Sequence, residues 1–313
     1  MKIIKVLLFT LPLLLSLTGC GGEDDLTPSD PDTNYFSVGD DATDATSLLR
    51  KAFYDKYGSY LLFNDTLSHV RTGTNAFGDP IYKDELLDVG YDPTGASNNV
   101  VYTYGYLTDI NSQQQAANFV EQYILPHLGA KLRPFSFLLV GSINKYTIDN
   151  NDFVPDYQDP NPTSVVGNRA TVFALDGILD GDEATMSSYA STVLGTILAS
   201  KVAAQDATTL SSFTNYCKDL YGQWFRDLGL TEPDDEESNM QAMYDAGFVV
   251  PHQSYGITFT GAYPSQAEDI NGYIQLCLNS SAEEVEQKYG SYLTIMEKYR
   301  IMSSLLETMG YVK

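Results

Sequence analysis

The sequence predicts an α+β fold with a sheet-rich N-terminal half and a helical C-terminal half. An amphipathic helix comes first, and short alternating apolar runs separated by turn signals follow it up to about residue 175. From about residue 183 the apolar spacing is helical to the end of the chain. A run of strands followed by a run of helices is typical of α+β proteins. We predict one domain over residues 43–313.

The first half of this domain is predicted to mix helices and strands. Turn signals at Gly78-Asp79-Pro80 and Asp92-Pro93-Thr94-Gly95 indicate hairpins between residues 60 and 110. Residues 149–168 are rich in Asp, Asn and Pro, and we expect a loop there. The predicted helices are 44–57 and 113–127, and the predicted strands are 59–63, 100–107, 133–140 and 168–175.

The second half is predicted to be helical, apart from a loop over residues 252–264. Tyr255, Phe259 and Tyr263 lie on this Gly-containing loop. Aromatic rings with a polar tip suit sugars and peptides, so the loop is a candidate binding platform. Packing of the same rings against the domain is an equally good interpretation. The predicted helices are 183–203, 208–228, 236–246, 265–279 and 282–309.

The N-terminus reads as a lipoprotein signal over residues 1–19. Lys2 and Lys5 precede an apolar run from Val6 to Leu17 that is too short to span a bilayer. Leu17-Thr18-Gly19-Cys20 follows, and it resembles a bacterial lipobox. We therefore expect Cys20 to become the mature N-terminus and to carry lipid. The alternative is an ordinary secretory signal with a chance cysteine.

Residues 20–42 are predicted to be an acidic, flexible tether. Gly21-Gly22-Glu23-Asp24-Asp25 resembles the surface-export signal of Bacteroidetes lipoproteins, which implies anchoring to the outer membrane at the cell surface. A solvated linker without an address is the alternative. No later run is long and apolar enough to cross a membrane, so outer-membrane lipid held through Cys20 is the expected attachment.

The charge excludes some classes of partner. The formal charge is −23, and without the predicted signal 16 basic residues face 41 acidic ones. Such a chain repels phosphate backbones, so nucleic acid is not an expected partner. It also repels anionic lipid headgroups.

No catalytic motif stands out among the residue types that usually carry one. His69, His127 and His252 are far apart, without the spacing that places two imidazoles on one helix face. The serine-hydrolase elbow is absent as well. Cys217 and Cys277 read as two buried thiols, with a disulfide as the alternative. Calcium is a weak candidate at the acidic runs 149–156 and 176–183, which turn formation also explains.

Several segments of the helical half resemble those of a known family. They are the strand Arg169–Leu175, the helix segment Thr192–Leu198, Ala246–Pro251, Ala267–Tyr273, and Lys298 with Tyr299. Together they resemble the zinc-metallopeptidase-like lipoproteins of Bacteroidetes that sit beside outer-membrane nutrient importers. The resemblance implies a zincin-like fold and a place in an importer complex. A helix that merely packs in the core is the alternative for residues 184–203.

This sequence departs from the family at the positions that carry the chemistry. Thr192 and Thr196 stand where the zinc-binding histidines are expected, and Val193 replaces the general-base glutamate. Gly272 replaces the second acid of the later helix, where only Glu268 and Asp269 remain. Because a zincin needs two imidazoles, a third ligand and a carboxylate base, we expect neither zinc nor a catalytic residue.

The expected function is therefore binding of a glycan or peptide, as a nutrient polymer or a partner protein. The predicted site is the degenerate cleft between helices 184–203 and 265–279. One alternative is an active zinc peptidase or other hydrolase that uses His252, Glu268 and Asp269, or a pair of carboxylates. Another is a structural surface protein without a small ligand. The residues expected in the cleft are Thr192, Val193, Thr196, Glu268, Asp269, Tyr255 and Tyr263.

Overall fold

The computed structural model describes residues 34, 36–90, 100–149, 152–155, 161–254 and 257–313. The chain divides into two compact units, Met1–Tyr35 and Phe36–Lys313, and the fold below is that of the second unit. The predicted signal, the lipid-bearing Cys20, most of the tether and the predicted turn at 92–95 lie outside the described residues. No described helix has the length and apolar character that crossing a membrane requires.

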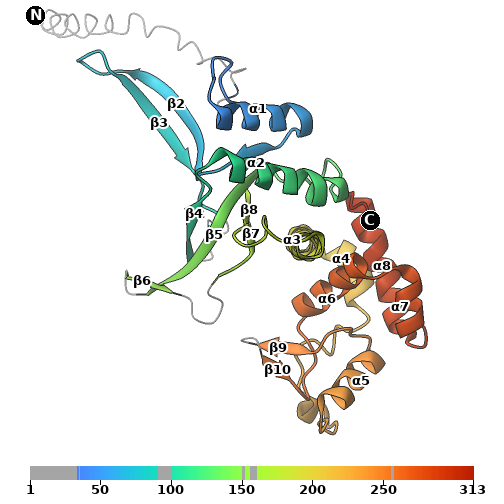
Figure 1. The fold of residues 1–313 in the computed structure, drawn as a ribbon. Helices are drawn as coiled ribbons and strands as arrows, with labels where there is room; N and C mark the ends of the chain where they lie inside the picture. Colours follow the sequence, from blue (N-terminus) through green and yellow to red (C-terminus); the bar gives the residue numbers. More distant parts are fainter. Residues whose placement is uncertain (1–33, 35, 91–99, 150–151, 156–160, 255–256) are drawn as a thin grey trace, which may run out of the picture. The chain divides into compact units, whose positions relative to one another are not determined.

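A mixed six-stranded sheet at the centre of Phe36–Lys313 confirms the α+β class (Figure 1). The strand order is β1-β5-β8-β7, and β4 and β6 pair with the second half of β5. The predicted strands 59–63, 100–107 and 168–175 are confirmed, whereas β6 and β7 lie in the segment predicted to be a loop. The strands are β1 (Tyr60–Leu62), β4 (Val100–Tyr106), β5 (Ser136–Asp149), β6 (Asp152–Pro155), β7 (Ser164–Val166) and β8 (Thr171–Ala174).

Strand β5 changes partners halfway along its length. Ser136 to Val140 runs parallel to β1 and β8, and the rest of the strand runs antiparallel to β4 and β6. The prediction ended this strand at Val140 because the apolar run stops there. The strand continues to Asp149 because β4 and β6 supply partners for its more polar second half.

The two faces of the sheet bury different clusters. Phe137 and Leu139 of β5 join Phe173 of β8 in the main core beneath the helices. Leu138 and Val140 point to the opposite face, where they form a second, smaller core. This alternation follows from the two-residue period of a strand.

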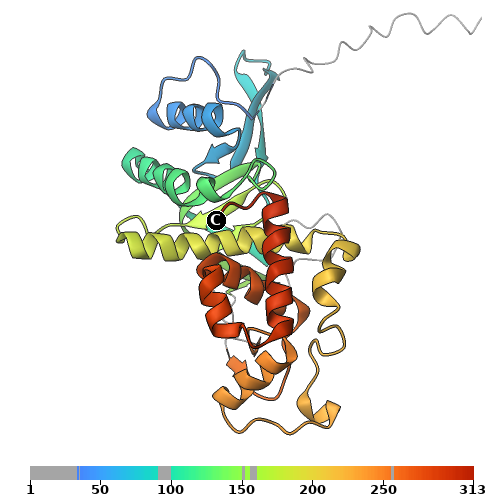
Figure 2. The same ribbon diagram turned by 90° about the vertical axis from the view of Figure 1, so that its right-hand side faces the viewer.

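The described residues form eight α-helices, and α3 lies between the sheet and the group formed by α4, α6, α7 and α8 (Figure 1; Figure 2 shows the same fold turned by 90°). The predicted helices 183–203 and 236–246 are confirmed with the predicted bounds. The helices are α1 (Ala45–Tyr57), α2 (Ile110–Phe119), α3 (Glu183–Ala203), α4 (Ala207–Thr214), α5 (Glu236–Ala246), α6 (Gln266–Asn279), α7 (Ala282–Tyr289) and α8 (Leu293–Met309).

Aspartate begins five of these helices. In each case the carboxylate accepts a hydrogen bond from a backbone N–H in the first turn. These hydrogen bonds hold the pKa of each aspartate below its ordinary value. Part of the acidity of the chain is thus used to cap helices. The capping residues are Asp44, Asp109, Asp182, Asp206 and Asp235.

Three predicted helices are shorter or interrupted. The helix predicted over 208–228 ends at Thr214 and gives way to turns, in which Gly222 has a φ of 67°, and a short 3-10 helix follows at Phe225–Leu228. The helix predicted over 282–309 breaks into α7 and α8 around Gly290. The helix predicted over 113–127 begins at Ile110 and continues after Phe119 as a π and then a 3-10 turn up to His127.

Two hairpins complete the described fold. Strands β2 (Thr66–Thr74) and β3 (Pro80–Leu86) pair around the predicted turn at Gly78. Strands β9 (His252–Ser254) and β10 (Ile257–Phe259) form a second hairpin in the segment 252–264, where a loop was predicted. The three-residue length of β9 and β10 gives too few alternations for a strand to be recognised from sequence.

Candidate functional site

Thr192, Val193 and Thr196, the positions compared with a zinc motif in the sequence, lie on α3 and do not form a ligand set. Thr192 is exposed and its hydroxyl donates to the Ser188 carbonyl at 3.2 Å. The Thr196 hydroxyl donates to the Thr192 carbonyl at 3.1 Å and accepts from the hydroxyl of Ser164 on β7 at 3.2 Å. Val193 is fully buried in the main core. Thr196 therefore faces β7, and Val193 is a packing residue.

The packing of α3 on α6 separates these threonines from Glu268. Ser191 donates to the Asn279 side chain at 2.5 Å, and the open Cα of Gly195 lies against the amide of Gln275. The two helices thus run in opposite directions, with the C-terminal end of α6 beside Thr192. Glu268 lies 11 residues before Asn279, which contacts Ser191, so it is about 15 Å along the axis of α6 from the level of Thr192. The predicted cleft residues therefore do not share one place.

Glu268 lies at the first turn of α6 and is held by several donors. It forms a capping box with Ser265, whose backbone N–H donates to the carboxylate at 2.6 Å. The Gln253 backbone N–H donates at 2.6 Å, and the His252 imidazole lies at 3.1 Å. Burial raises the pKa of Glu268, but these hydrogen bonds outweigh burial and lower it below its ordinary value.

Asp269, the next residue, is completely buried. Its two carboxylate oxygens lie 2.8 and 2.7 Å from Nζ of Lys298 on α8, and neither side chain of this pair is exposed. The Tyr221 hydroxyl donates to the same carboxylate at 2.7 Å. Consecutive helical residues point about 100° apart, which is why Glu268 reaches the surface and Asp269 the interior.

The ammonium of Lys298 fills a cage of aromatic and sulfur atoms. The rings of Phe213, Phe248 and Tyr273 surround it, with centroids 4.7, 4.9 and 4.6 Å from Nζ. Nζ also donates to the Gly247 carbonyl at 2.9 Å and lies 3.4 Å from Sγ of Cys217. This cage joins α6, α8, the end of α5 and the segment after α4 through one cation.

The charges of the cage are balanced internally. Burial raises the pKa of Asp269, and the charge of Lys298 and the two donors oppose that effect. Burial and then the negative charge of Asp269 raise the pKa of Tyr221, so its phenol stays protonated and keeps donating. Burial also raises the pKa of Cys217. The arrangement is thus a neutralised, closed ion pair.

Gly272 and the aromatic platform also have packing explanations. A Cβ at Gly272 would lie 2.8 Å from a methyl of Val250 and 3.2 Å from one of Val249, so no acid fits there. Tyr263 was a candidate for an exposed platform, but it is buried against Phe225 and Phe248. Tyr255 lies outside the described residues.

The alternative zinc set comes together only in part. His252 and Glu268 are adjacent, whereas Asp269 points into the Lys298 cage. Within the described ranges, no three His, Cys, Asp or Glu side chains gather as metal ligands would. In the second acidic run proposed for calcium, Asp182 caps α3. The first run lies partly outside the described residues.

The sequence predicted the state of the two cysteines but not the role of Lys298. Cys217 and Cys277 are both buried and unbridged, which confirms the prediction of two free thiols. Lys298 was noted only as part of a family resemblance. Its signal was present all the same, because it lies three residues after Ile295 and four before Met302, on the apolar stripe of α8.

Comparison with known proteins adds no assignment to this geometry. No family model matches the chain, and neither a curated protein nor a solved structure does.

Proposed function

We propose that this chain is an outer-membrane lipoprotein, displayed at the cell surface, whose zincin-like helical half binds a ligand instead of hydrolysing one. The proposed ligand is a nutrient polymer, glycan or peptide, or a partner protein of an importer complex. The lipobox at Cys20, the acidic tether and the resemblance of the helical half to metallopeptidase-like lipoproteins support this proposal.

The observation that carries the binding role is the use made of the two remaining acids. Asp269 is neutralised by Lys298 inside a closed cage, and Glu268 accepts from Ser265, Gln253 and His252. A hydrolytic centre needs ligands and a base whose lone pairs are open to metal, water and substrate. Both carboxylates instead have structural partners.

The proposed contact surface is the face that α3 presents beside β7. Thr192 is exposed and Thr196 is partly exposed, with the buried Ser164 of the edge strand behind it. The hydroxyl groups of these two threonines can accept hydrogen bonds from a sugar or a peptide without cleaving it. This surface replaces the single cleft expected from the sequence, since Glu268 lies elsewhere.

Metal analysis tests the binding role directly. The full-length chain is incubated with excess zinc, exchanged into metal-free buffer and analysed by mass spectrometry for bound metal. We expect no stoichiometric zinc to remain. Zinc retained at about one ion per chain and lost in Glu268→Ala would overturn the proposal, as would proteolysis that a chelator abolishes.

A second candidate, an active hydrolase, has one observation in its favour. His252 and Glu268 come within 3.1 Å of each other, as two ligands or an acid-base pair would. The same metal analysis in His252→Ala separates the candidates, because retention of zinc that depends on both residues would favour the hydrolase.

The lipid anchor is tested separately. Cells expressing the chain are fed an alkyne-tagged fatty acid, and the purified protein is examined for label. We expect label on the wild-type chain and none on Cys20→Ser. Equal labelling of the two would remove the lipoprotein part of the proposal and leave the binding role to be judged by the metal analysis.

A further inference from the structure

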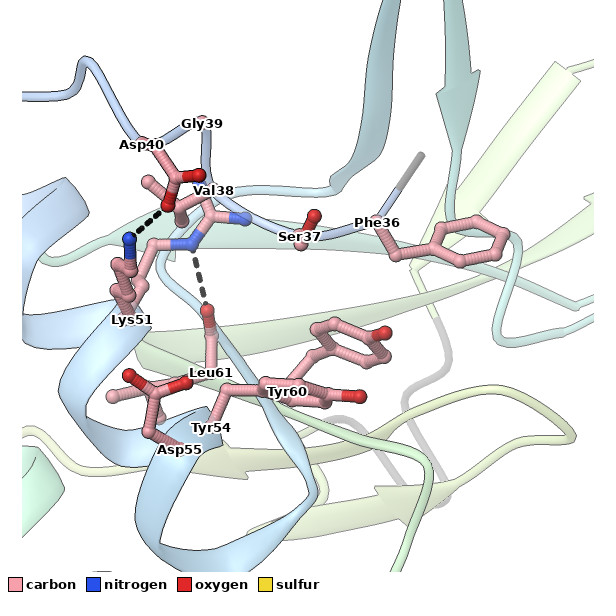
Figure 3. Close-up of a pocket in the computed structure, with 11 residues that line it drawn as sticks. Phe36, Ser37, Val38, Gly39, Asp40, Lys51, Tyr54, Asp55, Tyr60 and Leu61 are labelled. Atoms are coloured by element: carbon pink, nitrogen blue, oxygen red, sulfur yellow. Dashed lines mark hydrogen bonds and ion pairs between the residues drawn. The ribbon is translucent and has the colours of Figure 1, made fainter. Parts of the chain in front are cut away.

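A cavity of about 290 Å³ lies far from the α3 and α6 region, between α1, β1 and the segment that precedes α1 (Figure 3). Residues 36–40 form one wall and the second half of α1 forms the other, with β1 at the base. Its volume is at the lower end of the range of small-molecule sites, which is about 300–1,000 Å³. It could hold a ligand of roughly one sugar ring.

The aromatic part of the cavity is a preformed surface. The rings of Tyr54 and Tyr60 stack with centroids 4.4 Å apart and planes inclined by 17°. Phe36 packs edge-on against Tyr60, with ring centroids 6.0 Å apart. Figure 3 shows the two tyrosine rings stacked on each other below the segment 36–40. Tyr60 is buried, so the partly exposed ring of Tyr54, which it supports, is the apolar face open to the C–H groups of a ligand.

The polar part of the cavity contains one cation without a carboxylate partner. Lys51 is paired with Asp40 across the cavity. Arg50 is half-buried, and its Nε donates to the Leu61 carbonyl at 2.8 Å. In the part of the chain that the structure describes, the guanidinium of Arg50 makes no ion pair with an acidic side chain. Its other N–H groups remain as donors at the cavity wall.

This arrangement is unusual for the chain as a whole. Acidic residues outnumber basic ones by 41 to 18, so a half-buried arginine without an acidic partner runs against the composition. Desolvation by burial lowers the pKa of Arg50 even though the charge of Asp44 opposes it, which indicates that water alone does not fully solvate the cation. A bound carboxylate would supply two parallel hydrogen bonds in the geometry that guanidinium prefers.

We propose that this cavity binds a small hydroxylated monocarboxylate, such as a single hexuronic acid, with its carboxylate on Arg50 and its ring against Tyr54.

The remaining charges select this class over other anions. Asp40 and the exposed Asp55 also line the cavity, so its two cations and two acids balance. A dianionic phosphate would meet repulsion from both acids, whereas a monocarboxylate can place hydroxyl groups as donors to them. The inference does not depend on the lipid anchor or on the α3 surface.

Binding is measured by ligand-observed NMR and calorimetry on the full-length chain. The probes are galacturonate and glucuronate, each matched with the neutral sugar galactose or glucose, and with acetate and inorganic phosphate. We expect a hexuronate to bind at least about tenfold more tightly than its neutral match, because a charge-assisted hydrogen bond is lost in the neutral sugar. Acetate, which lacks the ring, should bind more weakly than the hexuronate.

The variant Arg50→Gln keeps a donor for the Leu61 carbonyl and should weaken hexuronate binding at least about tenfold. Arg226→Gln is the matched control, because this exposed arginine stacks on Trp224 outside the cavity and its loss should leave binding unchanged. Tyr54→Leu removes the stacked ring and should also weaken binding. It serves as the test if Arg50→Gln does not fold.

Three results would overturn the inference. One is hexuronate binding no tighter than that of the neutral sugar, and another is a folded Arg50→Gln that binds as wild type does. The third is phosphate or acetate binding as tightly as the hexuronate, since the cavity would then recognise charge alone. None of these results bears on zinc retention, so the failure of this inference and that of the binding proposal for α3 are distinguishable.

Discussion

Lys298 brings a full positive charge to a place with no solvent exposure, where Asp269 is its acidic partner. Loss of one partner leaves the other charge buried and unpaired. We therefore expect Asp269→Asn and Lys298→Met each to lower the free energy of unfolding by about 3–5 kcal/mol. The double variant, which buries no charge, should be distinctly more stable than the sum of the two losses implies.

Chemical denaturation of the four proteins measures this coupling energy as a double-mutant cycle. Arg300→Gln paired with Glu297→Gln is the matched control, since this ion pair lies exposed on the same helix. Its cycle should give a coupling energy below about 1 kcal/mol. Additive losses at Asp269 and Lys298 would contradict the account of the cage as a mutually dependent pair.

The contribution of Glu268 to the stability of the fold should depend on pH. Its pKa is lower in the folded chain than the ordinary value of 4.5, so its ionised form stabilises the fold above that pH. The contribution is lost as the pH falls through the lowered pKa. We expect Glu268→Gln to cost up to about 1 kcal/mol at neutral pH and progressively less in acid.

Urea denaturation of both proteins between pH 7 and pH 3 measures this difference. Repeating the comparison in a His252→Asn background removes the neighbouring imidazole, so the remaining pH dependence belongs to the carboxyl group. A stability difference that grows as the pH falls would contradict the assigned direction of the pKa shift.

At the level of single residues, the sequence singled out two acidic residues of α6 but did not predict their surroundings. Glu268 and Asp269 were predicted to line one cleft because they are adjacent in the chain. Helical geometry separates them, and the direction in which each points depends on α8 and β9, which are distant in sequence. Lys298 could have been suspected from its place on an apolar stripe, but its partner could not.

Two glycines on the packed helices α3 and α6 give a matched prediction at the scale of the element. A Cβ at Gly272 would contact branched methyl groups of Val250 and Val249, which have few rotamers. A Cβ at Gly195 would contact the end of the flexible Gln275 side chain. We expect Gly272→Ala to cost about 1–3 kcal/mol, because neighbouring backbone must move.

Gly195→Ala should remain within about 1 kcal/mol of wild type, because the higher helix propensity of alanine offsets displacement of the amide of Gln275. Thermal and urea unfolding of the two variants give the comparison. A larger loss at Gly195 than at Gly272 would contradict this prediction. It would show that the spacing between α3 and α6 tolerates an added methyl group less well than the contact of Gly272 with Val249 and Val250 does.

Elements with strong terminal signals were predicted well. Helix α5 has Asp235 as its N-cap, and Gly247 at a φ of 94° follows its C-terminus, so both ends are encoded locally. Helix α3 likewise begins after Asp182. The hairpin of β9 and β10 and the edge strand β7 were missed because each strand has three residues and is stabilised by its pairing partner.

At the scale of the whole molecule, the two buried thiols report on how cooperatively the domain unfolds. Cys277 lies in the main core, where burial raises its pKa to about 12, and Cys217 lies in the separate cluster beside Phe248. In a Cys20→Ser chain, both should resist a thiol reagent in native buffer and react in denaturant.

Mass spectrometry of samples labelled at increasing urea concentration assigns each modification. We expect both cysteines to become reactive over the same urea range, because the Lys298 cage ties the cluster around Cys217 to α6 and α8 of the core. Labelling of Cys217 at clearly lower urea would show that the small cluster opens on its own.

The overall order of a sheet-rich half followed by a helical half was predictable, because it depends on local periodicity. The pairing of the sheet was not. Nothing in the spacing of Ser136–Asp149 announces that one strand runs parallel to two partners and then antiparallel to two others. That pattern is decided by which segments the folded chain brings to each edge.

This switch in β5 has a consequence for the order in which the domain can form during synthesis. Among the described strands, β1 pairs with β5 alone, which begins 74 residues after Leu62, and β8, on the other side of β5, follows later still. The N-terminal third of the domain therefore leaves the ribosome without the sheet that will bury its apolar residues. Until Ala174 has emerged, the nascent chain exposes Leu61 and Leu62. It therefore depends on chaperones to keep it from aggregating.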